Sequence, residues 1–431
     1  MVHRRGWVLG MASALLVGAL GLGCDNGNKT DAKAEGPSGA AAEWKVGAYL
    51  SQSGEDTAFG VDTKEGIELA FDEVNQAGGV KGKPFKVLYE DDKSNPQEAS
   101  NKVLQLIDRD KVVAILGEVA SSRSRAGGIV ANKKKVPMIT PSSTNPDVTK
   151  VGPFVFRNCF TDDVQGKLGA DFIVDKLGKK KIAVLFASDD LYSSGLAKEF
   201  REEVKRKGGE IVADKGFLKK ETNFTTFINE IKAANPEVIY APIYYNAMAQ
   251  IARQAKAAGV PGNMFVGGDG WDADELLRDA GAELEGAFFT NHYAPDVPWE
   301  NSKKFVAKYK ERFKRDPSSL AAQGYDAAKL LADAIGRSKA TLDQPLDKQR
   351  DEIRQAIQDT KNFQGATGTI TINAERNADK PVVVVQIKDK KFTYYSTVGG
   401  AAPAPAPSTE PAAAPASASA SATAPATAPK K

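Results

Sequence analysis

The run Val112-Val113-Ala114-Ile115-Leu116-Gly117 decides the fold class, because its five apolar residues end at a glycine. A helical stretch rich in small residues follows, and the next apolar run, residues 136–140, comes after that stretch. Buried strands that alternate with helices in this way are typical of a parallel sheet covered by helices on both faces. The segment therefore predicts an α/β architecture.

The same alternation extends along the chain in both directions. Before this run, strands are predicted at residues 45–50 and 85–89, with a helix over 60–76 between them. Pro96 opens the next helix in the favoured first-turn position. After Thr161 the pattern starts again, with strands over 182–186, 210–217, 238–244 and 264–267 and helices over 164–177, 193–207, 224–234 and 247–258.

The last third of the globular part is more mixed. It predicts helices over 302–313, 320–335 and 348–358, and β-rich segments over 368–372, 382–387 and 392–397. About 350 residues of globular sequence exceed the usual length of one domain, which is about 100–200 residues. We therefore expect an α/β fold of two doubly wound parallel-sheet lobes.

The first residues are typical of an export signal. A basic start at residues 3–5 precedes an uncharged run, residues 6–23, so residues 1–23 are predicted to be a signal peptide rather than a membrane span. The signal ends Leu20-Gly21-Leu22-Gly23-Cys24, which resembles a bacterial lipobox with Cys24 as the lipidated residue, although Gly21 departs from the usual leucine. The alternative is an ordinary signal that happens to contain a cysteine. Residues 24–43 are polar and are predicted to be a flexible tether.

The other end of the chain is of low complexity. Residues 399–431 are almost wholly Ala, Pro, Ser and Thr, so they have little to bury and are expected to be disordered. The formal net charge of +3 includes the basic signal and the final Lys-Lys, so it does not indicate a nucleic-acid partner.

Composition argues against several enzyme classes. His292 is the only histidine after the signal, which excludes a multi-histidine metal site and leaves a Ser-His-Asp triad only if His292 serves. The chain has no G-x-S-x-G elbow, no P-loop and no H-E-x-x-H motif. We expect no catalytic residue, no metal and no cofactor; an enzyme that uses a pair of carboxylates is the remaining alternative.

Ligands of open parallel sheets bind beyond the carboxyl ends of the strands. The predicted strand ends here are rich in hydroxyls, glycine or acids, and they lie at residues 49–60, 117–124, 141–145, 189–194, 244–246 and 268–271. A small-molecule site is therefore expected at these ends.

The strand ends and their flanks resemble one protein family over residues 45–387. The resemblance is carried by residues 75–82 (NQAGGVKG), Gly117-Glu118-Val119-Ala120-Ser121-Ser122, residues 137–144 (PMITPSST), residues 253–259 (RQAKAAG) and Gly267-Gly268-Asp269-Gly270. The chain is similar to the type I periplasmic binding proteins, specifically the branched-chain amino acid (leucine/isoleucine/valine) group that feeds ABC importers.

The resemblance implies a three-segment hinge between the lobes, with crossings near Thr161, His292 and Lys380. The N-terminal lobe would then comprise residues 44–160 and 292–379, and the C-terminal lobe residues 161–291 and 380–398. It also implies binding by hinge closure, without catalysis, and docking on an ABC permease in the inner membrane.

The resemblance further implies a set of ligand-binding residues. Ser121, Ser142 and Thr144 would hold the carboxylate of an amino acid, and Asp269, where the family usually has glutamate, would pair with its ammonium. Tyr192 and Tyr244 would close over the ligand from the second lobe. The side chain would lie against residues of the first lobe, namely Phe59, Val119 and Ala120.

Each of these residues also has a plainer interpretation. Ser121 or Ser122 is suited to cap a helix, and Asp269-Gly270 to form a turn. The two tyrosines are suited to interfacial packing. Trp271 is expected to narrow the cleft or to stack on a flatter ligand, or else to pack at the surface.

Other functions remain open at this point. A ligand-sensing receptor would use the same cleft, and the ligand could be an amide, a urea-like molecule or an aromatic compound. Asp25, directly after Cys24, resembles the inner-membrane retention signal of some Gram-negative lipoproteins. We therefore expect the protein in the periplasm, anchored by lipid to the outer face of the inner membrane.

Overall fold

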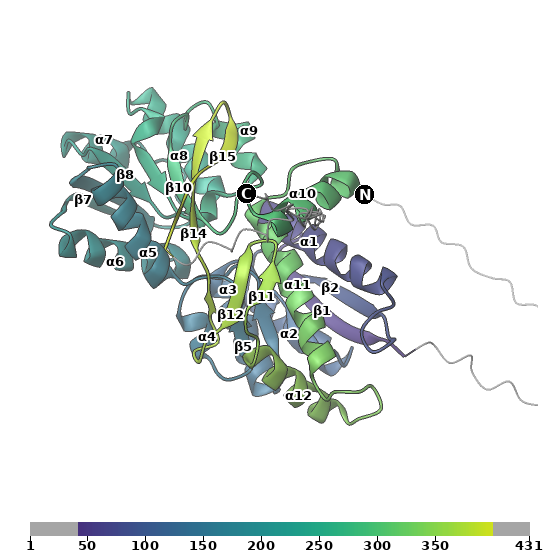
Figure 1. Ribbon diagram of the computed structural model, residues 1–431. Helices are drawn as coiled ribbons and strands as arrows, with labels where there is room; N and C mark the ends of the chain where they lie inside the picture. Colours follow the sequence, from purple (N-terminus) through teal and green to yellow (C-terminus); the bar gives the residue numbers. More distant parts are fainter. Residues whose placement is uncertain (1–41, 400–431) are drawn as a thin grey trace, which may run out of the picture. The chain divides into compact units, whose positions relative to one another are not determined.

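The computed structural model describes residues 42–399, which form two α/β lobes (Figure 1). The predicted signal peptide, Cys24, nearly all of the predicted tether and all but the first residue of the predicted tail lie outside the described residues. Among residues 42–399, no helix combines the length and the apolar character needed to cross a membrane.

The first lobe is built on a five-stranded sheet with the order β2-β1-β3-β4-β5, in which every pair of neighbours is parallel. Its strands are β1 Trp44–Leu50, β2 Phe85–Asp91, β3 Ala114–Leu116, β4 Met138–Thr140 and β5 Val155–Arg157. The helices that alternate with them are α1 Thr57–Gln76, α2 Pro96–Asp108, α3 Ser121–Lys133 and α4 Asp147–Lys150.

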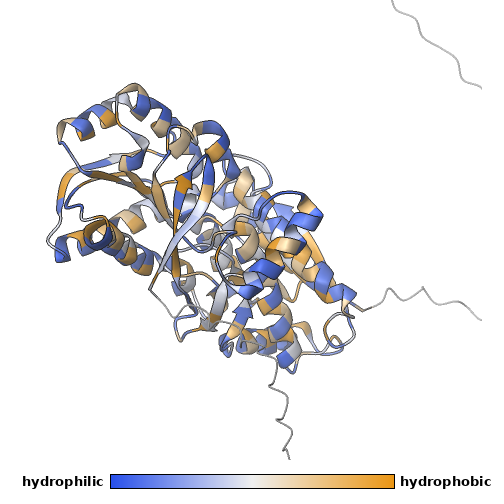
Figure 2. Ribbon diagram, turned by 45° about the horizontal axis from the view of Figure 1, so that its top comes forward, coloured by the Kyte–Doolittle hydropathy of each residue, from blue (hydrophilic) through white to orange (hydrophobic). Residues whose placement is uncertain are grey.

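The apolar runs become central strands because both faces of the sheet are covered. All residues of β1 except Lys45 are buried, and the three residues of β3 are buried as well. Strands buried on both faces read as continuous apolar runs rather than alternating ones. Figure 2 shows this pattern, with hydrophobic residues along the strands and mixed polarity along the helices. The parallel α/β prediction is confirmed for this lobe.

Helices from late in the chain complete the first lobe. They are α10 Glu300–Phe313, α11 Ser319–Arg337 and α12 Leu346–Gln358, followed by the three-stranded antiparallel sheet of β11 Phe363–Gly365, β12 Gly368–Ile372 and β13 Ala378–Asp379. α11 packs closely on α1, since a Cβ on Gly66 would lie 1.9 Å from the carbonyl oxygen of Ala321. Lys329 and Tyr325 each reach Glu73 of α1 at 2.9 Å.

The second lobe is built on a seven-stranded sheet with the order β15-β14-β10-β9-β8-β6-β7. Its strands are β6 Lys181–Ala187, β7 Glu210–Phe217, β8 Val238–Ala241, β9 Phe265–Gly267, β10 Phe288–Asn291, β14 Val382–Lys388 and β15 Lys391–Val398. Its helices are α5 Asp162–Asp171, which continues as a π-helical turn Phe172–Lys176, α6 Leu191–Arg206, α7 Thr225–Ala233, α8 Tyr245–Ala257 and α9 Asp274–Ala280.

The second sheet differs from the all-parallel prediction at one edge. β6 to β10 are parallel, but β14 runs antiparallel to β10, and β15 runs antiparallel to β14. β14 and β15 are joined by Asp389 and Lys390, both at positive φ, which is the backbone of a tight two-residue hairpin. Strands joined by so short a turn must run antiparallel, whereas parallel strands need a longer crossover, usually a helix. No helix therefore lies between β14 and β15.

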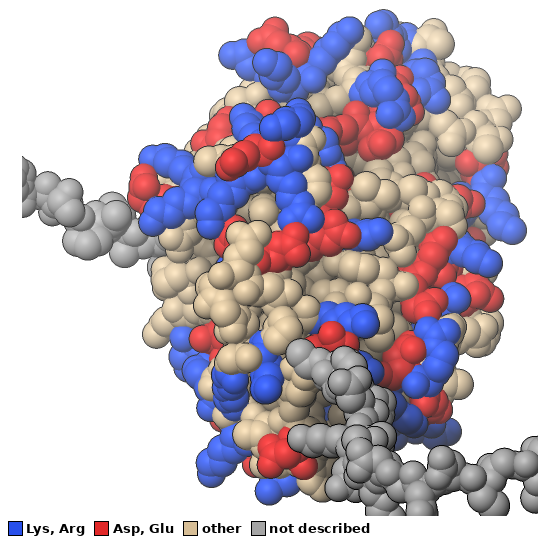
Figure 3. Space-filling view, turned by 90° about the vertical axis from the view of Figure 1, so that its right-hand side faces the viewer, with Lys and Arg blue, Asp and Glu red and all other residues tan. Residues whose placement is uncertain are grey.

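The chain passes between the two lobes three times. It leaves the first sheet after Arg157 and enters the second at Lys181, leaves the second after Asn291, and returns to it between Asp379 and Val382. We propose that these crossings are the hinge, with the lobe boundaries predicted above. On the face shown in Figure 3, acidic and basic side chains are interspersed over the surface.

Candidate ligand-binding site

A small cavity lies between the lobes, at the carboxyl ends of strands from both sheets. Its free volume is about 10 Å³, which is the space for about one water molecule. Eight of the nine predicted binding residues line it, together with Gly270 and Leu320, which were not predicted. The eight are Phe59, Val119, Ser121, Ser142, Thr144, Tyr192, Tyr244 and Asp269.

Hydroxyl groups of the first lobe form one end of this ligand cavity. Ser121 is the first residue of α3, and Ser142 and Thr144 follow β4. The Ser121 hydroxyl accepts a hydrogen bond of 3.2 Å from the backbone N–H of Asn145. The buried hydroxyl of Ser142 has no partner of good geometry among the described residues, and that of Thr144 lies beside the buried carboxyl group of Asp162. Buried hydroxyls beside a helix start suit an anionic group, because the helix dipole favours negative charge there.

The capping interpretation of Ser121 is wrong. The residue that caps α3 is Ala120, with extended backbone angles and no side-chain cap bond. Ala120 is not among the residues that line the cavity, since its methyl group packs in the core of the protein. Ala120 is therefore the one predicted binding residue that does not line the cavity, while its neighbours Val119 and Ser121 do.

Asp269 forms the opposite end, from the second lobe. It follows β9 and is only 8% exposed. Gln165 of α5 donates to its Oδ1 at 2.7 Å, and Nε2 of His292 lies 3.1 Å from its Oδ2. A carboxylate offers about four acceptor positions, so these two contacts fix its orientation and leave room for a cationic ligand group.

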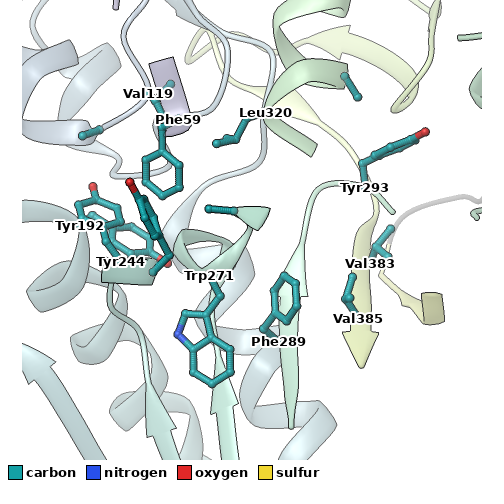
Figure 4. Packing of buried hydrophobic residues seen from close by; sticks show 14 of the residues in the cluster. Phe59, Val119, Tyr192, Tyr244, Trp271, Phe289, Tyr293, Leu320, Val383 and Val385 are labelled. Carbon is teal, nitrogen blue, oxygen red and sulfur yellow. The ribbon is translucent and has the colours of Figure 1, made fainter. Parts of the chain in front are cut away.

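Aromatic side chains close the cavity between these two ends (Figure 4). The rings of Tyr192 and Tyr244 are stacked, with centroids 5.0 Å apart and planes at 6°. Phe59 from the first lobe meets Tyr244 edge-on at 5.5 Å. The Tyr192 hydroxyl accepts a 3.1 Å hydrogen bond from the N–H of Gly270. Phe59, Val119 and Leu320 supply apolar walls.

Trp271 plays none of the roles expected for it. Its side chain is fully buried, its indole N–H donates to the carbonyl of Ala241 at 3.0 Å, and Figure 4 shows it pointing away from the cavity toward Phe289. It fits there because position 267 is glycine: a Cβ on Gly267 would lie 2.2 Å from the indole ring. Trp271 is therefore a core residue of the second lobe.

Four residues that help to build the site were not predicted from the sequence to do so. Leu320 lies far along the chain on α11, and nothing in its local pattern indicates a ligand. Gly270 belongs to the motif around Asp269, but no contact with a ligand was predicted for it. No motif named above contains Gln165, and the resemblance implies only a hinge crossing near His292. Both hold Asp269 in place, and the scarcity of histidine was the signal that could have drawn attention to His292.

His292 is held neutral by its surroundings. It is fully buried, and its ring lies 3.9 Å from that of Phe160. Burial lowers the pKa of His292 below its ordinary value of 6.5, and the nearby carboxylate of Asp269 only partly opposes this. Near neutral pH the His292 ring is therefore uncharged, so it does not compete as a cation with a cationic ligand group beside Asp269.

Ligand affinity should consequently fall in acid. Because the pKa of His292 is lowered in the folded protein, affinity for an amino acid should stay level from pH 8 down to 6.5, and fall once His292 becomes protonated and competes for Asp269. Calorimetric titration across this range measures the effect. A His292→Gln variant should lack that acid-side loss; an equal loss in both proteins would contradict the assignment.

The comparisons with known proteins point to one family. Residues 43–391 match the family model described as periplasmic binding protein. An amino acid binding protein of Pseudomonas aeruginosa is 32% identical over 243 residues, which cover 56% of this chain and 64% of that protein, just under two thirds of its length. Leu/Ile/Val-binding protein homolog 3 of Brucella melitensis is 26% identical over 345 residues, covering 80% of this chain and 91% of that protein.

Solved structures agree with the sequence relatives. A leucine-binding protein of Thermotoga maritima superposes with a TM-score of 0.76 and 36% identity, covering 82% of this chain and 98% of that one. A branched-chain amino acid transporter substrate-binding protein of Streptococcus pneumoniae, in complex with isoleucine, superposes with a TM-score of 0.77 and 31% identity. The match covers 83% of this chain and 99% of that one.

The chain belongs to the periplasmic binding protein family. The predicted resemblance and the predicted fold class are thereby confirmed. Membership implies an extracytoplasmic location, and the relatives described above are solute-binding proteins rather than enzymes.

Proposed function

We propose that this protein is the solute-binding component of an ABC importer and that its ligand is an α-amino acid with a small apolar side chain, of the branched-chain class. The observation that carries the proposal is the polarity of the ligand cavity. Buried hydroxyls and a helix start lie at its first-lobe end, and the Asp269 carboxylate lies at its second-lobe end. These ends suit the carboxylate and the ammonium of one amino acid.

The apolar walls suit the side chain of such a ligand. Phe59, Val119 and Leu320 line the cavity, whose free volume is about 10 Å³, so an amino acid would enter only when the lobes open. The leucine-binding and isoleucine-bound relatives support the branched-chain class. Asp269 stands where the family usually has glutamate, and Gln165 and His292 direct it toward the cavity.

Binding would proceed by closure of the lobes about the three crossings. The first lobe would capture the carboxylate, and the second would then bring Asp269, Tyr192 and Tyr244 onto the ligand. Only the closed form contacts both ends of the amino acid, so the ligand shifts the equilibrium toward that form. This step needs no chemical change of the ligand, and we propose none.

The partners follow from the same proposal. The closed protein would dock on an ABC permease in the inner membrane, and acylation of Cys24 would hold it at the outer face of that membrane. Acyl chains on the N-terminal tether would leave both lobes in the periplasm.

A ligand screen tests the proposal directly. Thermal unfolding of the purified protein is measured with each of the twenty amino acids, and with acetamide, urea and benzoate as the competing classes. Leucine, isoleucine and valine should stabilise it by about 2.7 kcal/mol at a hundredfold excess over Kd. Glutamate and lysine should have no effect, because the cavity walls offer no partner for a second charge. Stabilisation by benzoate or an amide, and by no amino acid, would replace the proposed ligand.

A further inference from the structure

Lys219 is a second-lobe residue that reaches the first lobe outside the ligand cavity. It follows β7, and its backbone N–H is anchored on Oδ1 of Asp189 at 2.7 Å. Its Nζ lies 3.7 Å from Oδ2 of Asp56 and 3.9 Å from Oε2 of Glu55, both of which precede α1 in the first lobe. The same Nζ lies 5.5 Å above the ring of Tyr244, a wall of the ligand cavity.

Asp56 belongs to a buried ionic network in the first lobe, formed by Asp56, Asp92, Glu118 and Arg123. Nη1 of Arg123 lies 2.7 Å from Asp56 and its Nε lies 2.9 Å from Glu118, with Asp92 at 3.9 Å. The side chains of all four are at most 1% exposed. Three carboxyl groups thus surround one guanidinium. Burial first, and then the neighbouring Glu118, raise the pKa of Asp92 to about 7.

The network also reaches the ligand cavity. Oε2 of Glu118 accepts a hydrogen bond of 2.6 Å from the N–H of Ala120, at the start of α3 and next to Ser121. The network therefore connects the hydroxyl end of the cavity with the surface that faces the second lobe. At that surface the charge is unbalanced in favour of the carboxylates, so it attracts a cation from the other lobe.

Lys219 also borders the space outside the ligand cavity. A second cavity is lined by Glu55, Asp190, Lys219 and Asn246, among others, and it shares Tyr244 with the ligand cavity. Two weaker polar contacts join the lobes beside it: the Tyr245 hydroxyl donates to the carbonyl of Glu55 at 3.0 Å, and Asn246 reaches Asp56 at 3.4 Å. Lys219 and Lys220 both line this second cavity, but only Lys219 of the two lies within 4.0 Å of a carboxylate of the described residues.

We infer that Lys219 determines ligand affinity without touching the ligand, by holding the closed lobes together through its ion pair with the buried network around Asp56. The inference rests on the proposed function, since it assumes closure on an amino acid. Opening the cleft separates Lys219 from Asp56, so the pair favours the closed form alone. By linkage, whatever favours the closed form raises the affinity for the ligand.

The test compares three variants of the full chain. Lys219→Met should weaken leucine binding about fivefold, because partly exposed ion pairs contribute up to about 1 kcal/mol, and the loss should lie in faster dissociation. Lys219→Arg keeps the charge and should retain nearly all of the affinity. Lys220→Met is the matched control, because no carboxylate of the described residues lies within 4.0 Å of Lys220, and it should bind like the wild type.

Salt provides a readout that a merely structural role would not change. Leucine affinity of the wild type should fall between 0.05 and roughly 0.5 M salt, because screening weakens the exposed side of the pair. The affinity of Lys219→Met should change less over the same range. Equal dissociation rates for Lys219→Met and Lys220→Met, or equal salt dependence of Lys219→Met and the wild type, would overturn the inference.

A ligand-free measurement separates this inference from the proposed function. Dyes on cysteines placed at the exposed Lys133 and Lys205, in a Cys24→Ser background, report the distance between the lobes by energy transfer; Cys159 is buried and should not react. Lys219→Met should lower the closed fraction even without ligand. If no amino acid binds the wild type but this shift is seen, the proposed ligand is wrong and the role of Lys219 stands. If leucine binds but the shift is absent, the proposed ligand stands and the role inferred for Lys219 is wrong.

Discussion

Replacing Asp269 with asparagine should weaken amino acid binding by about 2–5 kcal/mol, which is roughly thirtyfold or more. The substitution keeps the shape of the side chain and an oxygen that can accept from Gln165 or His292. It removes the negative charge that Asp269, which is only 8% exposed, presents to the cavity. The ammonium of the ligand would then be desolvated without a counter-charge, and that cost appears in full in the affinity.

Calorimetric titration with leucine measures this effect. Asp163→Asn is the matched control, because Asp163 is an exposed acid on α5 outside the ligand cavity. This variant should bind leucine as tightly as the wild type. An Asp269→Asn variant that binds leucine as tightly as the wild type would show that the ammonium is held elsewhere, and the orientation proposed for the ligand would be wrong.

Replacing Arg123 with methionine should reduce the free energy of unfolding by about 3–5 kcal/mol. Methionine fills a similar volume, but Asp56 and Glu118 would lose the guanidinium at 2.7 and 2.9 Å and remain buried beside Asp92. Removing the single cation of this buried ionic network leaves its carboxylates without a counter-charge, and keeping them out of water is then costly.

Urea denaturation of wild type and variant gives this difference from the shift of the unfolding midpoint. Arg125→Met on the same helix is the control, because Arg125 is exposed and its substitution should change stability by less than about 0.5 kcal/mol. A loss below about 1 kcal/mol in Arg123→Met would mean that water reaches the cluster or that the carboxyl groups take up protons at little cost.

The parts of the fold that were predictable from the sequence are those with a local signal. The apolar runs at β1, β3 and β4 must lie in a covered parallel sheet, and the rule for strand ends then places hydroxyls and acids at one edge. That reasoning, together with the family resemblance, named eight of the ten residues that line the cavity. Their contact with an amino acid stays a prediction.

The parts that could not be predicted depend on contacts between distant segments. β10 has four residues, of which Thr290 and Asn291 are polar, so its membership of the sheet is decided by its neighbours β9 and β14. Leu320 reaches the cavity only because α11 packs on α1. The orientation of Asp269 depends on Gln165, 104 residues earlier, and on His292. No local pattern encodes such pairings.

The packing of α11 on α1 has a consequence for how the chain acquires its structure. Glu65 of α1 meets Arg315, which lies 250 residues later between α10 and α11, and Glu73 accepts a hydrogen bond from Tyr325 of α11, 252 residues later. While the ribosome is still extending the chain, α1 has no cover for its apolar face, and the first lobe stays incomplete until the second lobe's first five strands have been made. Folding that waits for such distant contacts is slow. For a chain that folds outside the cytoplasm, such a delay would leave the polypeptide unfolded while it is threaded across the membrane.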